Sequence, residues 1–165
     1  MKKLILAALI ALPMSAFAQK FAHVNSATII QAMPEYTTAQ TDLQTLGKSY
    51  EEEIKRMQDE LQSKYEDYQK NGASLPDATK QRREQELTDL DQRLNQYAQT
   101  AQQEMDKARQ EKMQAISDKI QKAIQEVGTS GGYVYIMDVT AGIPFINETL
   151  STDVTNQVKT KLGIK

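Results

Sequence analysis

The 165-residue sequence contains no cysteine, no tryptophan and a single histidine. Disulfide bonds are therefore impossible, and most transition-metal and thiol chemistry is excluded, because cysteine and histidine are its usual carriers. Seven glycines and four prolines are too few for a chain built from many short strands and turns. A net charge of −2 gives no basic footprint, so the sequence predicts no nucleic-acid partner.

The first 18 residues have the pattern of a secretory signal peptide. Met1-Lys2-Lys3 is a basic start, residues 4–12 are an unbroken apolar run, and Ala16-Phe17-Ala18 is a cleavage signal. The apolar run falls short of the roughly 20 residues that a membrane-spanning helix needs, which disfavours the alternative of a membrane anchor. We expect cleavage after Ala18 and an exported, soluble chain whose net charge is −4 without Lys2 and Lys3.

Residues 37–127 carry the strongest pattern, a helical stripe with an 11-residue period. This period corresponds to 3.67 residues per turn, which predicts a nearly straight pairing of helices. The stripe is interrupted at residues 71–74, and we expect a new helix near Pro76 with Ser74 as its N-cap. The apolar positions before the interruption are Leu43, Leu46, Tyr50, Ile54, Met57, Leu61, Tyr65 and Tyr68.

The second stripe mirrors the first when the chain is folded back at residues 71–74. Residues whose numbers sum to about 147 or 148 then lie opposite each other, and every such partner is apolar. This match predicts a long antiparallel helical hairpin, a coiled-coil arm over residues 37–127. The predicted pairs are Leu61–Leu87, Met57–Leu90, Ile54–Leu94, Tyr50–Tyr97, Leu46–Ala101, Leu43–Met105 and Ala39–Ala108.

The two ends of the chain have strand-like composition, which makes the predicted fold class α+β. Phe21–Val24 reads as a strand, and Ser26 is placed to cap a short helix that ends near Pro34. After the hairpin come the β-rich stretch Tyr133–Met137, a turn at residues 140–142, the apolar residues 143–146 and a last short helix. We expect residues 19–36 and 128–165 to form one small body, from which the arm projects.

This body is too small to be stable by itself. The second helix continues beyond its partner with Met113, Ile116, Ile120, Ile124 and Val127, which only the strands and residues 29–33 could cover. A core of this size is marginal, and oligomerisation is a common remedy. The sequence therefore predicts a multimer that is joined at the β-rich body.

No residue set supports catalysis. Gly128-Thr129-Ser130-Gly131-Gly132 matches G-x-S-x-G, but a nucleophile elbow follows a strand and precedes a helix, whereas here a helix comes first. We interpret these glycines as a helix C-cap and a flexible entry to a strand. His23 has no second ligand with which to hold a metal, and Glu51-Glu52-Glu53 lies on a solvated helix face. Without a phosphate-binding loop no nucleotide cofactor is expected, so we predict no enzyme, cofactor or metal site.

Two tyrosines extend beyond the mirrored stripe, near the tip of the hairpin. Tyr65 and Tyr68 would face Arg82 and Thr79. They could stack on the guanidinium of Arg82 or Arg83. They could equally form an exposed contact surface for an apolar partner, and the sequence leaves both interpretations open.

The order of these segments resembles the Skp/OmpH family. The resemblance rests on the signal peptide, F-A-H-V-N-S at 21–26, M-P-E-Y at 33–36, the charged hairpin, the β-rich return and D-V-T at 153–155. It implies that V-N-S ends the first strand, M-P-E-Y leads into the arm and D-V-T caps the last helix. It also implies a periplasmic chaperone for outer-membrane proteins, a trimer whose three arms surround a cavity that holds unfolded clients without ATP.

Methionine and tyrosine side chains suit such adaptable binding, since methionine is flexible and polarizable. The candidate client contacts are Met57, Tyr65, Tyr68, Tyr97 and Met105. The candidate oligomer contacts in the body are Phe21, Val24, Val134, Ile136, Phe145 and Ile146. The best-known members of the family are strongly basic, so the charge of −4 leaves no residues to assign to lipid or lipopolysaccharide binding. The alternative function is a structural or adaptor coiled coil of the cell envelope; a prefoldin-like hairpin conflicts with the signal peptide.

Overall fold

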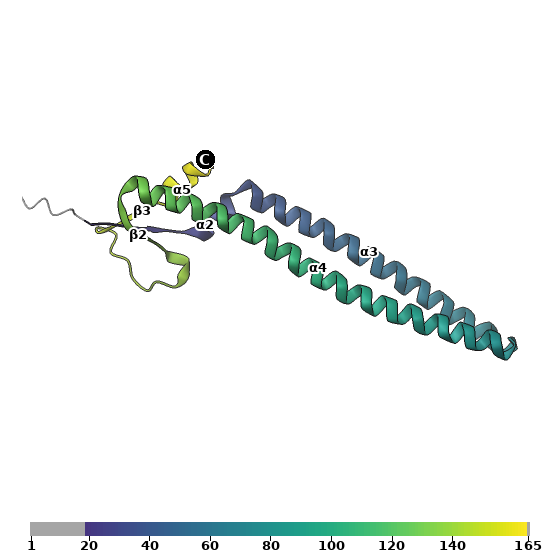
Figure 1. Cartoon of the computed structure of the whole chain (residues 1–165). Coiled ribbons are helices and arrows are strands. Elements are labelled where there is room, and N and C mark those ends of the chain that lie inside the picture. Colours follow the sequence, from purple (N-terminus) through teal and green to yellow (C-terminus); the bar gives the residue numbers. More distant parts are fainter. Residues whose placement is uncertain (1–18, 165) are drawn as a thin grey trace, which may run out of the picture. The chain divides into compact units, whose positions relative to one another are not determined.

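The computed structural model describes residues 19–164, so the predicted signal peptide and its cleavage site lie outside the described residues. Figure 1 shows two long helices and a small sheet, which confirms the α+β class. In chain order the elements are β1 (Lys20–Val24), α2 (Ser26–Ala32), α3 (Pro34–Asn71), η1 (Gly72–Ser74), α4 (Asp77–Gly131), β2 (Tyr133–Asp138), η2 (Val139–Ala141), β3 (Ser151–Asp153) and α5 (Thr155–Lys161).

The described chain divides into two compact units. Residues 30–119 form the hairpin unit, and residues 19–29 together with 120–164 form the body unit. The last three turns of α4 thus belong to the body, where Ile120, Ala123 and Val127 are buried. The apolar stripe of α4 that extends beyond the hairpin is therefore buried within the body unit.

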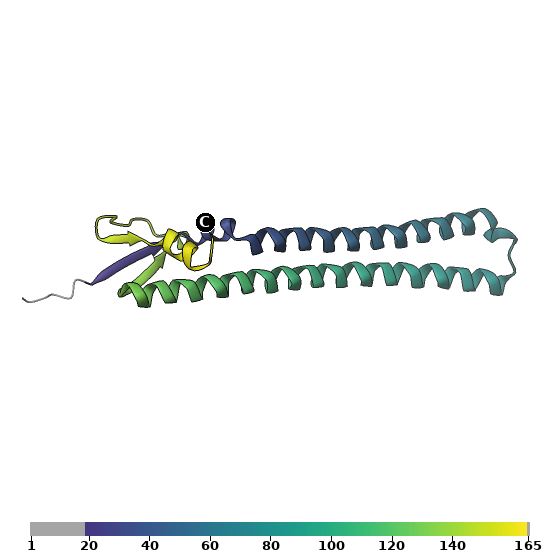
Figure 2. The ribbon, with the colours of Figure 1, turned by 90° about the horizontal axis from the view of Figure 1, so that it is seen from above.

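In the hairpin unit, α3 and α4 run antiparallel and side by side, as the two views in Figures 1 and 2 agree. Pro34 begins α3, where its missing N–H costs nothing and its fixed φ favours the helix. Threonines follow in the first turns, and the Thr38, Thr41 and Thr45 hydroxyls donate to carbonyls four residues earlier, at 2.9–3.1 Å. These bonds satisfy side chains that otherwise compete with the helical backbone.

The turn between α3 and α4 has a different cap from the predicted one. The Ser74 hydroxyl donates to the carbonyl of Asn71 at 2.8 Å, so Ser74 closes the end of α3 instead of starting α4. The carbonyl of Pro76 accepts from the N–H groups of Thr79 and Lys80, at 2.9 and 3.0 Å, and opens α4. Serine bonds equally well backward or forward in a turn, which is why the sequence alone assigned it wrongly.

In the body unit, all three strands are parallel and lie in the order β2-β1-β3. The predictions for β1 and β2 are confirmed to within one residue at one end of each strand. Residues 143–146 are irregular rather than extended, and the third strand is the polar segment Ser151–Asp153. Its pairing with residues 21–23 of β1 gives the central strand two neighbours.

One face of this sheet is covered by helices. Ala22 and Val24 are fully buried on it, and Ile136 from the neighbouring register position lies against Gly128 of α4. Ile29 of α2, Val154 just before α5 and Val158 of α5 complete the body core. The buried positions of β1 alternate, as expected for a sheet with one helix-covered face.

Short polar bonds join the strand ends to the helices. The Asn25 side chain accepts from the N–H of Thr28 at 3.0 Å and is the N-cap of α2, the role predicted for Ser26. Ser26 instead bonds the carboxylate of Asp138, at the end of β2, through its N–H and its hydroxyl. Asp153 accepts from the N–H of Thr155 at 2.8 Å, so the residues that the resemblance marked as a cap do start α5.

We expect Gly47→Ala to stabilise the hairpin, because alanine in a helix interior is favoured over glycine by about 0.5–1 kcal/mol. The added Cβ would meet the Met105 methyl at 3.7 Å, an ordinary contact. The melting temperature, followed by circular dichroism, should rise by about 2–4 °C at most. Gly132→Ala is the matched control and should lower it, because Gly132 has a φ of +65°. A lower melting temperature for Gly47→Ala would contradict the described packing.

Two carboxylates should make the body sensitive to acid. Partial burial raises the pKa of Asp138, but hydrogen bonds from Ser26 and Thr140 outweigh it, so the pKa lies below the ordinary value of 3.8. For Asp153, burial is likewise outweighed by hydrogen bonds from Thr155, and its pKa is lowered. Both groups therefore stabilise the fold above about pH 4 and lose that contribution as the pH falls through their lowered folded-state values.

In acid titrations monitored by circular dichroism, Asp138→Asn and Asp153→Asn should be less stable than the parent at pH 7 and should lose less further stability below pH 4. Glu52→Gln, an exposed position on α3, should follow the parent curve. Parallel curves for all four proteins would show that neither aspartate contributes in this way.

Candidate functional site

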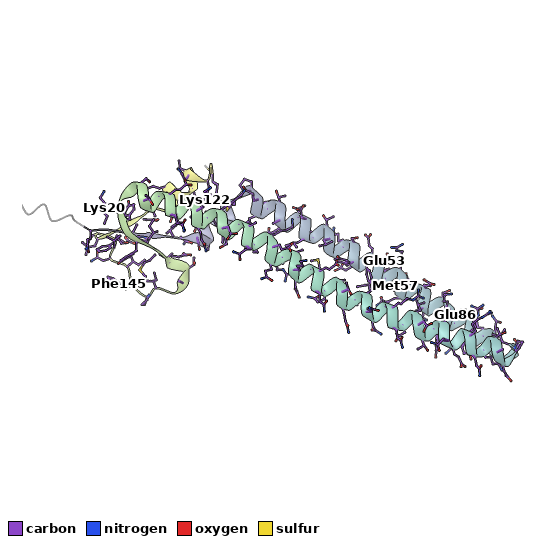
Figure 3. The ribbon with its side chains drawn as sticks, in the orientation of Figure 1. Lys20, Glu53, Met57, Glu86, Lys122 and Phe145 are labelled. Carbon is purple, nitrogen blue, oxygen red and sulfur yellow. The ribbon has the colours of Figure 1, made fainter. Side chains whose placement is uncertain are left out.

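The seam between α3 and α4 is mostly half-buried. Each helix turns one stripe toward the other, and Met57 lies on the side of α3 that faces α4 (Figure 3). Ala39, Leu90, Ala101 and Ile116 are buried. The remaining stripe residues of the hairpin unit keep part of their surface in solvent: Leu43, Leu46, Tyr50, Ile54, Met57, Leu61, Tyr68, Leu87, Leu94, Tyr97, Met105, Ala108 and Met113.

Two of the predicted pairs can be followed directly. Tyr50 and Tyr97 pack edge to face with ring centroids 6.1 Å apart, and Leu61 and Leu87 line the same groove. Contacts also reach further along α4 than one partner per residue, since the Tyr50 hydroxyl donates to Glu104. Each helical side chain leans toward the N-terminus of its own helix, so across an antiparallel seam it spans two turns of its neighbour.

At the base of the seam, residues of α3 also lie beside residues further along α4 than the predicted partners. Ala39, which was predicted to face Ala108, lines a groove of about 310 Å³ together with Ala115 and Ile116. The one-to-one mirror is therefore too simple at this end, although both alanines belong to the apolar stripes.

Two ion pairs cross the seam beside this groove. Lys112 Nζ lies 2.7 Å from the Asp42 carboxylate, and Lys119 Nζ lies 2.8 Å from that of Glu35. The hydrogen bond from Lys119 lowers the pKa of Glu35 below its ordinary value. Exposed pairs of this kind contribute at most about 1 kcal/mol each, so they orient the two helices more than they stabilise them.

The two tyrosines near the tip differ from each other. Tyr65 is 50% exposed and lines a groove of about 550 Å³ with Leu61 and Leu87. The Tyr68 hydroxyl donates to Glu84 at 2.5 Å, and its ring lies over Gly72. This hydrogen bond raises the pKa of Tyr68.

The arginines that were considered as stacking partners have other contacts. Arg82 and Arg83 both reach Glu86, at 3.8 and 3.5 Å. Of the two tyrosines, Tyr65 has the more accessible surface.

A second apolar surface lies on the body unit, on the face of the sheet away from α4 and α5. There Phe21 stacks on Tyr135 with ring centroids 4.9 Å apart, and the irregular segment 143–150 covers the two rings only in part. Phe145 and Leu150 on that segment are 77% and 70% exposed. We call Tyr135, Met137, Phe145 and Leu150 the body patch.

The residues predicted for oligomer contacts fall into three groups. Val134 and Phe145 are exposed, and Phe21, Ile136 and Ile146 are half-buried. Val24 is fully buried in its own unit, which makes it a core residue rather than a contact. The sequence analysis did not single out Tyr135, Met137 and Leu150, which are also exposed, because alternation along a strand shows that two faces differ but not which one the chain covers itself.

The features considered for chemistry have structural roles. His23 Nδ1 lies 2.9 Å from the Ser151 hydroxyl and joins β1 to β3. α4 continues through Gly131, and Gly132 with positive φ ends it, as expected for a glycine C-cap. Across residues 19–164, no three histidine, aspartate or glutamate side chains gather as a metal site would require. Within the same range, no helix combines the length and apolar character needed to cross a membrane.

Comparison with known proteins gives consistent matches along nearly the whole chain. The family model described as "Outer membrane protein (OmpH-like)" matches residues 20–162. A protein of Photorhabdus luminescens named "Chaperone protein Skp" is 31% identical over 165 residues, covering 96% of this chain and all of that protein. A protein of the same name from Yersinia enterocolitica is 28% identical over 164 residues, again with 96% and 100% coverage.

A solved structure shares the fold. The crystal structure of an OmpH-like protein from Caulobacter crescentus superposes with a TM-score of 0.75 at 14% identity. The match covers 87% of this chain and 83% of that one.

Proposed function

The chain belongs to the OmpH-like family, and on that premise we propose that it is an ATP-independent holdase that binds unfolded outer-membrane proteins and prevents their aggregation. Two relatives that are named chaperones, and that this chain matches along their full length, support the chaperone role. The observation that carries the holdase mechanism is the seam of the hairpin, whose leucine, methionine and tyrosine side chains are half in solvent.

Such a surface matches what an unfolded barrel protein exposes. Unpaired strands present alternating apolar residues and free backbone groups, and they aggregate edge to edge. A long row of flexible side chains makes many weak contacts without demanding one shape from the client. Binding lowers the free concentration of the unfolded chain by mass action, so no catalytic step is needed. The proposed contacts are Met57, Tyr65, Tyr68, Tyr97 and Met105.

We place this activity in the periplasm. The support is the signal-peptide pattern of residues 1–18, with cleavage after Ala18. The barrel proteins of the outer membrane must pass through that compartment unfolded, and a holdase there would act without a nucleotide supply.

We also propose that copies of the chain associate as a trimer through the β-rich end, residues 19–36 and 128–165, most of which belongs to the body unit. The support is the body patch, because contiguous exposed apolar surface on a small unit marks an interface. The body core consists of a few valines, isoleucines and alanines, which is little for an independent unit.

Dilution of a urea-unfolded outer-membrane β-barrel protein into buffer tests the holdase. Light scattering from the aggregating barrel should fall severalfold when the exported chain, residues 19–165, is present in excess without nucleotide. Unchanged scattering at excess would contradict the proposal. Binding of a folded envelope protein without any effect on the barrel would favour the alternative, a structural or adaptor coiled coil.

Size-exclusion chromatography with multi-angle light scattering tests the association. The exported chain should have the mass of three copies, and Phe145→Ser combined with Leu150→Ser should shift it toward one. Both side chains are largely exposed, so circular dichroism should show unchanged helix content in the variant. Glu148→Gln on the same segment is the matched control. A single-copy mass for the parent chain would contradict the proposed interface.

A further inference from the structure

His23, the only histidine of the chain, lies on the same face of the sheet as the body patch. Along β1, Ala22 and Val24 are buried on the helix-covered face. Phe21 and His23 alternate with them, and both are half-buried on the opposite face. The register places His23 beside Met137 of β2, a member of the patch.

The imidazole lines a pocket of about 240 Å³ between the sheet and the irregular segment 143–150. All four residues of the body patch line the same pocket. Apart from His23, only Asn147 and Ser151 add polar side chains to an otherwise apolar and aromatic lining. The Ser151 hydroxyl lies 2.9 Å from His23 Nδ1, so one ring nitrogen has a polar partner within the unit.

The strands, the covering segment and α5 carry other ionisable side chains around His23. They are Lys20, Tyr133, Tyr135, Asp138, Glu148, Asp153, Lys159 and Lys161. Ammonium groups and phenols change charge only near about pH 10. Asp138 and Asp153 keep their charge above about pH 4, since the pKa of each lies below its ordinary value of 3.8. Imidazole, in contrast, is the side-chain group whose charge changes between about pH 5 and pH 8.

We infer that His23 makes the association through the body patch sensitive to pH, so that copies of the chain join when its imidazole is neutral and separate when it is protonated. The inference rests on the proposed association. Another copy would cover the patch, and a positive charge in the pocket beneath would then lose its contact with water, which is costly. A neutral imidazole carries no such cost and keeps its bond to Ser151.

Asp153 is the acidic group nearest in register to His23, and it offsets part of this cost. Its Oδ1 already accepts from the N–H and the hydroxyl of Thr155, at 2.8 and 2.6 Å. An ion pair repays the loss of water only when its geometry is good and its remaining polar atoms are bonded. The attraction of Asp153 for a protonated His23 is therefore too small to reverse the sign of the effect.

Proton linkage gives the direction of the expected change. If the associated state disfavours the protonated imidazole, separation of the copies takes up protons, and a lower pH favours it. A trimer holds three copies of His23, so up to three protons are taken up together. The effect falls between about pH 5.5 and 7.5 and is thus separate from the loss of carboxylate contributions below about pH 4.

Size-exclusion chromatography with multi-angle light scattering, on a dilution series at pH 7.5 and 5.5, measures this dependence. The exported chain, residues 19–165, should have the mass of three copies at pH 7.5 and shift toward one at pH 5.5, with a dissociation constant raised at least about tenfold. His23→Gln, which can still bond Ser151 but does not titrate, should give the same constant at both values. Glu148→Gln is the matched control for the carboxylate on the covering segment and should keep the pH dependence of the parent.

His23→Lys carries its charge at both pH values and should have the mass of one copy at both, with unchanged helix content by circular dichroism. Equal constants for the parent at pH 7.5 and 5.5 would overturn the inference, as would a His23→Gln chain that dissociates in acid like the parent. A three-copy mass for His23→Lys at both values would overturn it as well. A single-copy mass for the parent at pH 7.5 would instead remove the association itself, and the inference with it.

Discussion

The structure of the hairpin unit depends on one geometric constraint, which is that two helices share a single seam. A side chain on that seam has one helix opposite and solvent on both flanks, so only small or central residues such as Ala101 and Leu90 become buried. A third helix would close the seam and give a conventional core. Its absence from the unit leaves apolar side chains half-accessible along tens of ångströms of helix, a loss of packing that is also the basis of the proposed binding.

Exposed apolar surface is consequently distributed differently in the two units. In the body, helices cover one face of the sheet and a short irregular segment partly covers the other, leaving Phe145 and Leu150 exposed in a compact patch. In the hairpin, accessible surface is spread thinly over many residues, none as exposed as Phe145. A compact patch suits a partner of fixed shape, whereas a dispersed row of flexible side chains suits partners without fixed shape.

Much of the fold could be predicted from the sequence because its main signal is long and repeated. The stripes of α3 and α4 specify the helices, their antiparallel pairing and the position of the turn, and Tyr50 does meet Tyr97. Caps were assigned to the wrong residues, since Asn25 and Ser26 are equally good candidates and only Asp138, far along the chain, decides between them. β3 was missed because Ser151–Asp153 has no apolar alternation and becomes a strand by pairing with β1.

The candidate site was less predictable than the fold. Periodicity identifies the stripe but does not show which charged side chains reach across it to the other helix. Lys112 and Lys119 lie near the middle of their stripe and form ion pairs with Asp42 and Glu35 across the seam. Similarly, Val24 and Val134 look alike in sequence, yet one is buried in its own unit and the other is exposed.

The parallel sheet determines the order in which helices and strands can form when the chain emerges from a ribosome or a membrane pore. β1 appears first, but both strands that flank it follow the hairpin, and the last of them ends at Asp153. Local helix pairing can proceed during emergence, whereas the central strand waits for almost the entire polypeptide. Until then β1 has two unpaired edges, which makes this chaperone-like chain, while nascent, similar to the clients proposed for it.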